Sequence, residues 1–227
     1  MHDIVIRGGT IIDGSGKPAF SGDVAIENGK IAAVGGKPGP AKRDIDASGL
    51  MVTPGWVDVH THYDGQAMWD PLLAPSCWHG VTTVMFGNCG VGFAPVKKHH
   101  RGALMDLMEG VEEIPNPVLA AGLTWEWESF PDFMDALERR ERAIDICAQA
   151  AHLPLRVYVM GDRAIRREPA TPDDIAALES VQQGLATYRE VPWSVMNRGM
   201  AKEGEQLNTD ELHLRAFWIQ WDKLMSQ

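Results

Sequence analysis

The chain has 227 residues, of which 44% are hydrophobic and 23% charged, a composition typical of a globular protein with one or two domains. The net charge of −10 argues against a nucleic-acid partner, because phosphate binding needs clustered Lys and Arg. No apolar run is long enough to cross a membrane, and residues 1–9 lack the pattern of a signal peptide. Three scattered cysteines are too few for a disulfide framework, so we expect a cytoplasmic protein.

Residues 1–52 predict a small N-terminal β-sandwich module. The β-rich stretches Asp3–Ile6 and Thr10–Ile12 are separated by two glycines, and Asp44–Val52 is a further extended stretch. Asn28-Gly29 lies between two apolar runs, a strong hairpin signal, so Asp23–Ile26 and Lys30–Val34 are expected to pair.

Residues 53–172 predict βα units with a parallel sheet, closer to a barrel than to an open sheet. The expected strands and helices alternate along the chain: strands at Gly55–Val59, Gly80–Phe86 and Ala143–Ala151, helices at Leu104–Gly110 and Phe130–Arg142, with Ser129 as the N-cap of the second helix. A (β/α)8 barrel takes roughly 250 residues. We therefore expect the first three or four units of an incomplete barrel, with an open edge through which the protein could self-associate.

Residues 173–227 predict a helical tail of different ancestry. Asp173–Tyr188 has helical character, with acidic residues in its first turn. Apolar residues from Leu214 to Leu224 recur at helical spacing behind a cap at Asn208 or Thr209.

A pair of histidines, His60 and His62, follows the first strand of the expected barrel. Side chains two residues apart on a strand share a face, so both imidazoles could bind one metal ion at the end where barrel enzymes hold their active sites. Asp58 and Asp64 each lie two residues from the pair, and their carboxylates could orient the imidazoles by accepting a hydrogen bond from the ring nitrogen that does not bind the metal. The alternative is two unrelated surface histidines, and the entry turn and buried strand before the pair favour the metal site.

The segment from Pro54 to His62, Pro-Gly-Trp-Val-Asp-Val-His-Thr-His, resembles the start of the amidohydrolase superfamily. The segment from Phe86 to Pro95, Phe-Gly-Asn-Cys-Gly-Val-Gly-Phe-Ala-Pro, is similar to the N-acyl-D-amino-acid deacylase family within it. The resemblance extends over about residues 1–172. It implies a metal-dependent hydrolase barrel that binds zinc or another divalent metal and cleaves the N-acyl amide bond of a small N-acyl-D-amino acid with metal-activated water.

The resemblance also implies a third metal ligand, Cys89, whose thiolate suits zinc. The alternative is a small buried cysteine that only packs. Many amidohydrolases use a lysine to bridge two metals, but between Pro54 and Pro172 the lysines are Lys97 and Lys98, in a polar loop. This favours Cys89.

Two residues after the third strand are candidates for substrate binding. His152 could line the site, although a structural role in hydrogen bonding is an equal alternative, and Arg156 could face a substrate carboxylate. The catalytic aspartate and two further metal-binding histidines of the family have no counterpart here, so no catalytic residue is assigned. We expect a truncated protein, and its activity alone is left open.

Three other functions remain open. A cyclic-amide hydrolase, like a hydantoinase or dihydroorotase, would be favoured by a lysine at a strand end, which is missing. A non-catalytic metal-binding remnant or fusion is the second. The third is an oxygenase-related subunit. Glu179–Leu185 and Asp210–Trp218 resemble the C-terminus of Rieske-type ring-hydroxylating oxygenase α subunits, where an acidic residue near the position of Asp173 or Asp174 helps to bind iron. The iron-binding histidine pair and the iron–sulfur motifs of that family are missing from the sequence, so nothing supports oxygenase activity.

Overall fold

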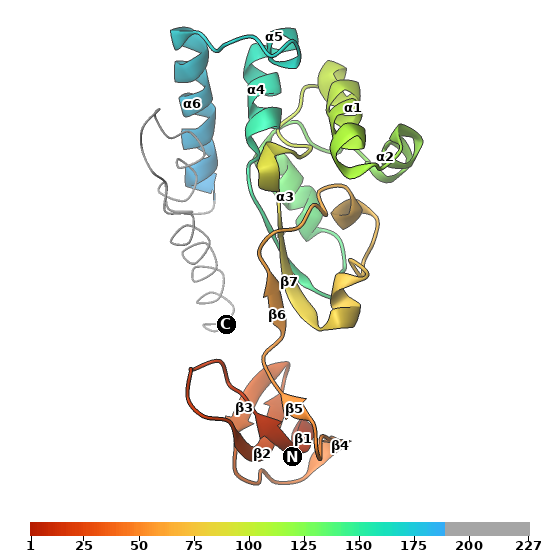
Figure 1. Cartoon of the computed structure of the whole chain (residues 1–227), viewed down its shortest axis with the longest axis vertical. Helices are drawn as coiled ribbons and strands as arrows, with labels where there is room; N and C mark the ends of the chain where they lie inside the picture. The colour runs from red at the N-terminus through yellow and green to blue at the C-terminus, as the bar shows by residue number, and fades with distance from the viewer. Residues whose placement is uncertain (189–227) are drawn as a thin grey trace. The chain divides into compact units, whose positions relative to one another are not determined.

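A computed structural model describes residues 1–188, without the side chains of residues 182–188. The chain divides into two compact units, Met1–Trp56 and the part from Val57 onward (Figure 1). The tail segments expected around 197–227 lie outside the described residues. None of the helices in the described part of the chain is long and apolar enough to cross a membrane.

The N-terminal unit is built around one long central strand. Its strands are β1 (His2–Ile11), β2 (Phe20–Glu27), β3 (Lys30–Val34), β4 (Ala41–Asp46) and β5 (Met51–Val52). The sheet order is β3-β2-β1-β4, with β5 also paired to β1. Strand β1 runs antiparallel to β2 and parallel to β4 and β5. The predicted hairpin is confirmed, with Asn28 and Gly29 at positive φ angles of 51° and 73°.

Three sequence-based expectations for this unit are wrong. The strand is not interrupted at Gly8-Gly9: β1 continues, and its register shifts between Ile6 and Gly9. Asp44–Val52 forms two short strands rather than one. The unit is one five-stranded sheet rather than a sandwich of two, because β1 pairs with β2, β4 and β5 and satisfies their backbone groups within a single sheet.

The second unit contains the βα elements. Its sheet has the order β6-β7-β8, formed by Trp56–Asp58, Val81–Phe86 and Asp145–Ala148, and β7 and β8 are parallel. The predicted strands are thus present, but the third stops at Ala148 and His152 begins a helix. A proline in the first helical turn loses no hydrogen bond, so Pro154 fits the start of this helix.

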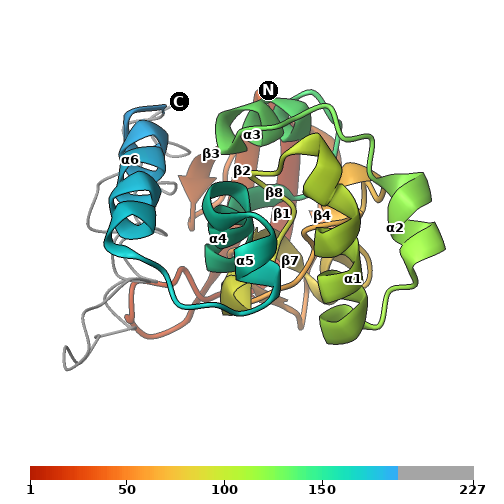
Figure 2. The same cartoon turned by 90° about the horizontal axis from the view of Figure 1, so that it is seen from above.

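Helices cover this sheet and bury its core (Figures 1 and 2). The α-helices are α1 (Arg101–Glu112), α2 (Asn116–Gly122), α3 (Phe130–Glu138), α4 (His152–Met160), α5 (Asp162–Ile165) and α6 (Pro172–Tyr188). Short 3₁₀ turns lie at Gln66–Met68, Ser76–His79, Asn88–Gly90 and Lys98–His100. The apolar core joins β7 to α1, α2 and α3 through fully buried side chains such as Phe86, Leu104, Leu119 and Leu137.

The starts of two helices follow from local chemistry. Ser129 caps α3 as expected: its hydroxyl accepts a hydrogen bond from the N–H of Asp132, whose carboxylate accepts one from the Ser129 N–H. Helix α3 ends at Glu138, four residues before the predicted end. Helix α6 begins with a similar reciprocal cap between Thr171 and Asp174.

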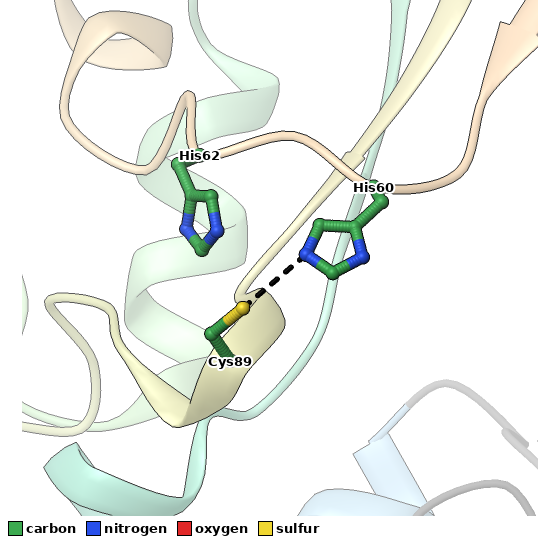
Figure 3. Close-up of side chains that lie close together, drawn as sticks. All are labelled: His60, His62 and Cys89. Atoms are coloured by element: carbon green, nitrogen blue, oxygen red, sulfur yellow. Dashed lines mark hydrogen bonds between the residues drawn. The ribbon is translucent and has the colours of Figure 1, made fainter. Parts of the chain in front are cut away.

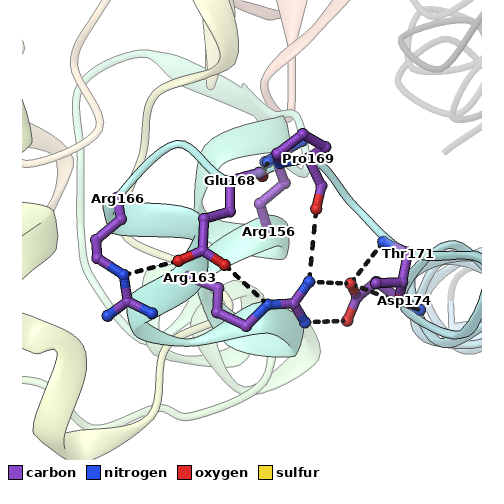
Figure 4. Close-up of polar contacts among 7 residues, drawn as sticks. All are labelled: Arg156, Arg163, Arg166, Glu168, Pro169, Thr171 and Asp174. Carbon is purple, nitrogen blue, oxygen red and sulfur yellow. Dashed lines mark hydrogen bonds and ion pairs between the residues drawn. The ribbon is translucent and has the colours of Figure 1, made fainter.

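Hydrogen bonds from Arg163 link the start of α6 to the turn that precedes it (Figure 4). Its guanidinium donates two hydrogen bonds to Asp174, at 3.1 and 2.9 Å, and one to Glu168 at 3.3 Å. Arg163, followed by the Thr171 groups, lowers the pKa of Asp174 to about 2. The Asp174 carboxylate therefore pairs with an arginine and caps a helix, and both contacts are structural.

This contact predicts a pH-dependent stability. The folded-state pKa of Asp174 lies below its ordinary value of 3.8, so the contact stabilises the fold above about pH 4 and is lost as the pH falls toward 2. Asp174→Asn should lower the Tm at pH 7 and converge with wild type at pH 2 to 3. Asp173→Asn, which removes the same charge from an exposed neighbour, is the control. Equal Tm losses in both variants would contradict the role of Arg163.

Candidate metal centre

His60 and His62 lie in the bend that follows β6, past the end of the strand itself. Thr61, between them, is buried, and its N–H and hydroxyl both donate to the Met85 carbonyl of β7, at 2.9 and 2.7 Å. Because Thr61 points inward, the two imidazoles point the other way, with ring centroids 5.5 Å apart. The side chains of residues 60–62 therefore alternate between the two faces, as expected of a strand, although they lie past the end of β6.

Cys89 lies in the turn that follows β7, in the sequence Gly87-Asn88-Cys89-Gly90. Gly87, Cys89 and Gly90 all have positive φ, at 84°, 53° and 77°. A side chain at Gly87 would come within 2.4 Å of the Gln149 carbonyl oxygen, so only glycine fits there. A positive φ is uncommon for a residue with a Cβ, and such strained conformations cluster at functional sites.

Asn88 holds these segments together from the inside. This buried side chain donates to the carbonyl oxygens of Thr61 and Met85, at 3.1 and 3.0 Å, and accepts from the Gln149 side chain at 2.8 Å. The Gln149 N–H in turn donates to the Phe86 carbonyl. One amide thus links the segments that follow β6, β7 and β8.

His60, His62 and Cys89 come together as a result (Figure 3). The His60 Nε2 lies 3.3 Å from the Cys89 Sγ, and one donor atom from each of the three residues lies within 4.8 Å of the others. Zinc binds imidazole nitrogen and thiolate sulfur at about 2.0 to 2.3 Å, which puts neighbouring ligand atoms within about 4 Å of one another. The donor set therefore fits such an ion after a small inward movement of the side chains.

The two flanking aspartates contact backbone rather than imidazole. Asp58 accepts from the His60 N–H at 3.2 Å. Asp64 is 3% exposed and accepts from the Gly87 N–H, and burial raises its pKa to about 7. Each aspartate therefore braces the loops that hold the donors, instead of orienting a ring as expected.

A carboxylate that sequence reasoning missed faces the site. Glu112, the last residue of α1, places an oxygen 3.4 Å from the His62 Nδ1. The two residues are separated by 50 positions in the sequence, and no local pattern marks Glu112. Only the packing of α1 against the sheet brings them together.

The two predicted substrate-binding residues are in different surroundings. His152 begins α4 beside residues 87–90, the cysteine loop. A Cβ on Gly90 would lie 3.6 Å from the His152 Cβ. Burial, and then the charge of Arg156, lower the pKa of His152. Arg156 itself donates to the Glu168 carbonyl at 2.8 Å (Figure 4). The structure thus brings His152, but not the guanidinium of Arg156, toward the three donors.

Comparison with known proteins places this chain in a family. The model of the amidohydrolase family matches residues 43–199. This chain belongs to the amidohydrolase family. It is similar to a D-aminoacylase of Alcaligenes xylosoxydans xylosoxydans, with 34% identity over 80% of this chain and 35% of that protein.

Two solved structures resemble the described fold. A crystal structure of D-aminoacylase has a TM-score of 0.67 and 31% identity, and covers 86% of this chain and 40% of that one. N-acyl-D-glutamate deacylase from Bordetella bronchiseptica, complexed with zinc and a phosphonate inhibitor, has a TM-score of 0.65 and 32% identity over 81% of this chain and 36% of that one. The chain spans about a third of the length of the curated relatives it matches.

The Asn88 contacts can be tested by removing them. Asn88→Ala leaves the carbonyls of Thr61 and Met85 and the Gln149 amide without this partner, which should cost about 2 kcal/mol or more. Urea unfolding measures this loss. Asn116→Ala removes one hydrogen bond, to Asp106 near the surface, and should cost less than about 1 kcal/mol. Equal losses would show that Asn88 is not a central link.

Proposed function

We propose that this chain is part of a metal-dependent amidohydrolase that hydrolyses the N-acyl bond of N-acyl-D-amino acids. In this proposal His60, His62 and Cys89 bind zinc or a related divalent ion. The observation that carries it is the convergence of these donors from two loops, within 4.8 Å of one another. Cysteine and histidine together form a ligand set that favours zinc over the harder ions magnesium and calcium.

A divalent ion bound by these donors would supply Lewis acidity, which would polarise a carbonyl group and lower the pKa of water. The chain's own residues contribute position. The backbone around Cys89 is held in its strained conformation by Gly87 and by the Asn88 hydrogen bonds. The thiol is exposed, so both metal and substrate can reach it.

The substrate class rests on the relatives. Those named above act on D-amino-acid derivatives, and the identity of about 34% extends over most of this chain. Their activities belong to whole proteins, of which this chain covers 35% and 33%. His152, next to the cysteine loop, is the described residue that we propose contacts the substrate.

The proposed metal site predicts a selective loss of zinc. Wild-type protein should retain zinc after dialysis against metal-free buffer, and Cys89→Ala or His60→Ala should lose most of it, as measured by inductively coupled plasma mass spectrometry. Cys77→Ala, which removes a thiol that packs against the core, is the matched control and should keep wild-type zinc content. Unchanged zinc in Cys89→Ala would refute the assignment of the cysteine.

The proposed reaction predicts amino-acid release from N-acetyl-D-amino acids and not from their L enantiomers. Acidic and apolar side chains should both be assayed, with the free amine quantified by chromatography. Activity should fall on chelation, return with zinc and be missing in His60→Ala. Equal turnover of the L enantiomers would overturn the proposed substrate class, and turnover that survives chelation would overturn the role of the metal.

A further inference from the structure

The Nδ1 atom of His62 is buried and has no aligned hydrogen-bond partner among the described residues. The carboxylate oxygen of Glu112 faces it at 3.4 Å, and both side chains are about one-fifth exposed, at 20% and 21%. Buried polar atoms in folded proteins nearly always have partners. An N–H···O hydrogen bond is about 2.9 to 3.0 Å long and close to linear, so a shift of roughly half an ångström that also aligns the N–H with the oxygen would complete this one.

The position of Glu112 is unfavourable for the helix that carries it. Glu112 ends α1, where the helix dipole is negative and favours cations, yet the last turn of α1 contains no basic residue. Its charge also acts on the buried Asp64 nearby. Among the described residues, the ion-pair partner of Glu112 is His62. Helix stability therefore does not explain why a carboxylate lies at this position. A contact with a histidine that binds a cation does explain it.

We propose that Glu112 is a positioning residue that accepts the Nδ1–H of His62 and leaves the Nε2 lone pair for the metal. This inference rests on the proposed function. A neutral imidazole carries its proton on one nitrogen and offers the other as a ligand. In Figure 3 the two nitrogens of His62 lie on opposite sides of the ring, and one faces the space beside His60 and Cys89. A carboxylate on the far nitrogen fixes both the tautomer and the ring.

Zinc affinity provides the first test. Glu112→Ala should raise the zinc Kd by about 10- to 100-fold, the usual effect of removing such a partner. Glu112→Gln keeps an oxygen acceptor at the same distance along the side chain and should recover part of that loss. Glu109→Gln removes an exposed charge one turn earlier in α1 and should bind zinc within about twofold of wild type.

The histidine tautomer gives a second readout that needs no metal. In ¹⁵N-histidine-labelled, metal-free protein at pH 8, His62 should carry its proton on Nδ1. In Glu112→Ala it should shift toward the Nε2–H form, and Glu109→Gln should match wild type. A purely structural role for Glu112 would lower the Tm and leave the tautomer unchanged, and that result would overturn the inference. Glu112→Gln keeps the test available if the alanine variant does not fold.

The outcomes separate the two proposals. Zinc that binds wild type through His60 and Cys89, and binds Glu112→Ala equally tightly, overturns only the role of Glu112. An Nε2–H tautomer in wild type does the same. Wild-type protein that takes up no zinc overturns the proposed function, and with it the metal-directed role of Glu112.

Discussion

The candidate site depends on the side chain of one buried asparagine. Asn88 bonds to the loop after β6, to the end of β7 and to the segment after β8, so one side chain links three chain segments that backbone hydrogen bonds also join. Backbone carbonyls buried at strand ends need donors, and Asn88 supplies two with one amide group. These contacts flank both donors, because Thr61 follows His60 in the chain and Asn88 precedes Cys89.

The same constraint explains why strain is tolerated at Cys89. A left-handed residue costs free energy, and it persists where surrounding contacts fix it. Gly87 permits the close approach to Gln149 that begins the turn, and Gly90 continues it beside His152. The cysteine is thereby exposed at the surface, while Asn88, the residue before it, is buried. Adjacent residues thus serve opposite purposes, one chemical and one structural.

Features set by local chemistry were predictable from the sequence, and features set by packing were not. The Asn28-Gly29 hairpin and the Ser129 cap follow from turn and capping preferences, and the strand at residues 81–86 follows from its apolar run. The role of Cys89 beside the histidines was predicted from a family resemblance and not from local chemistry. The contact of Glu112 with His62 has no local signal, because it depends on where a helix ends relative to a loop.

The Asn88 hydrogen bonds use none of the three candidate donor atoms. The loops are therefore linked by hydrogen bonds within the chain that do not pass through the candidate donors, whereas in zinc fingers metal binding drives folding. An ion that enters such a site does not need to order the backbone, so its binding free energy is not spent on loop entropy. Under the proposed function, removal of the ion would then leave the Asn88 hydrogen bonds, and the loop arrangement that they link, in place.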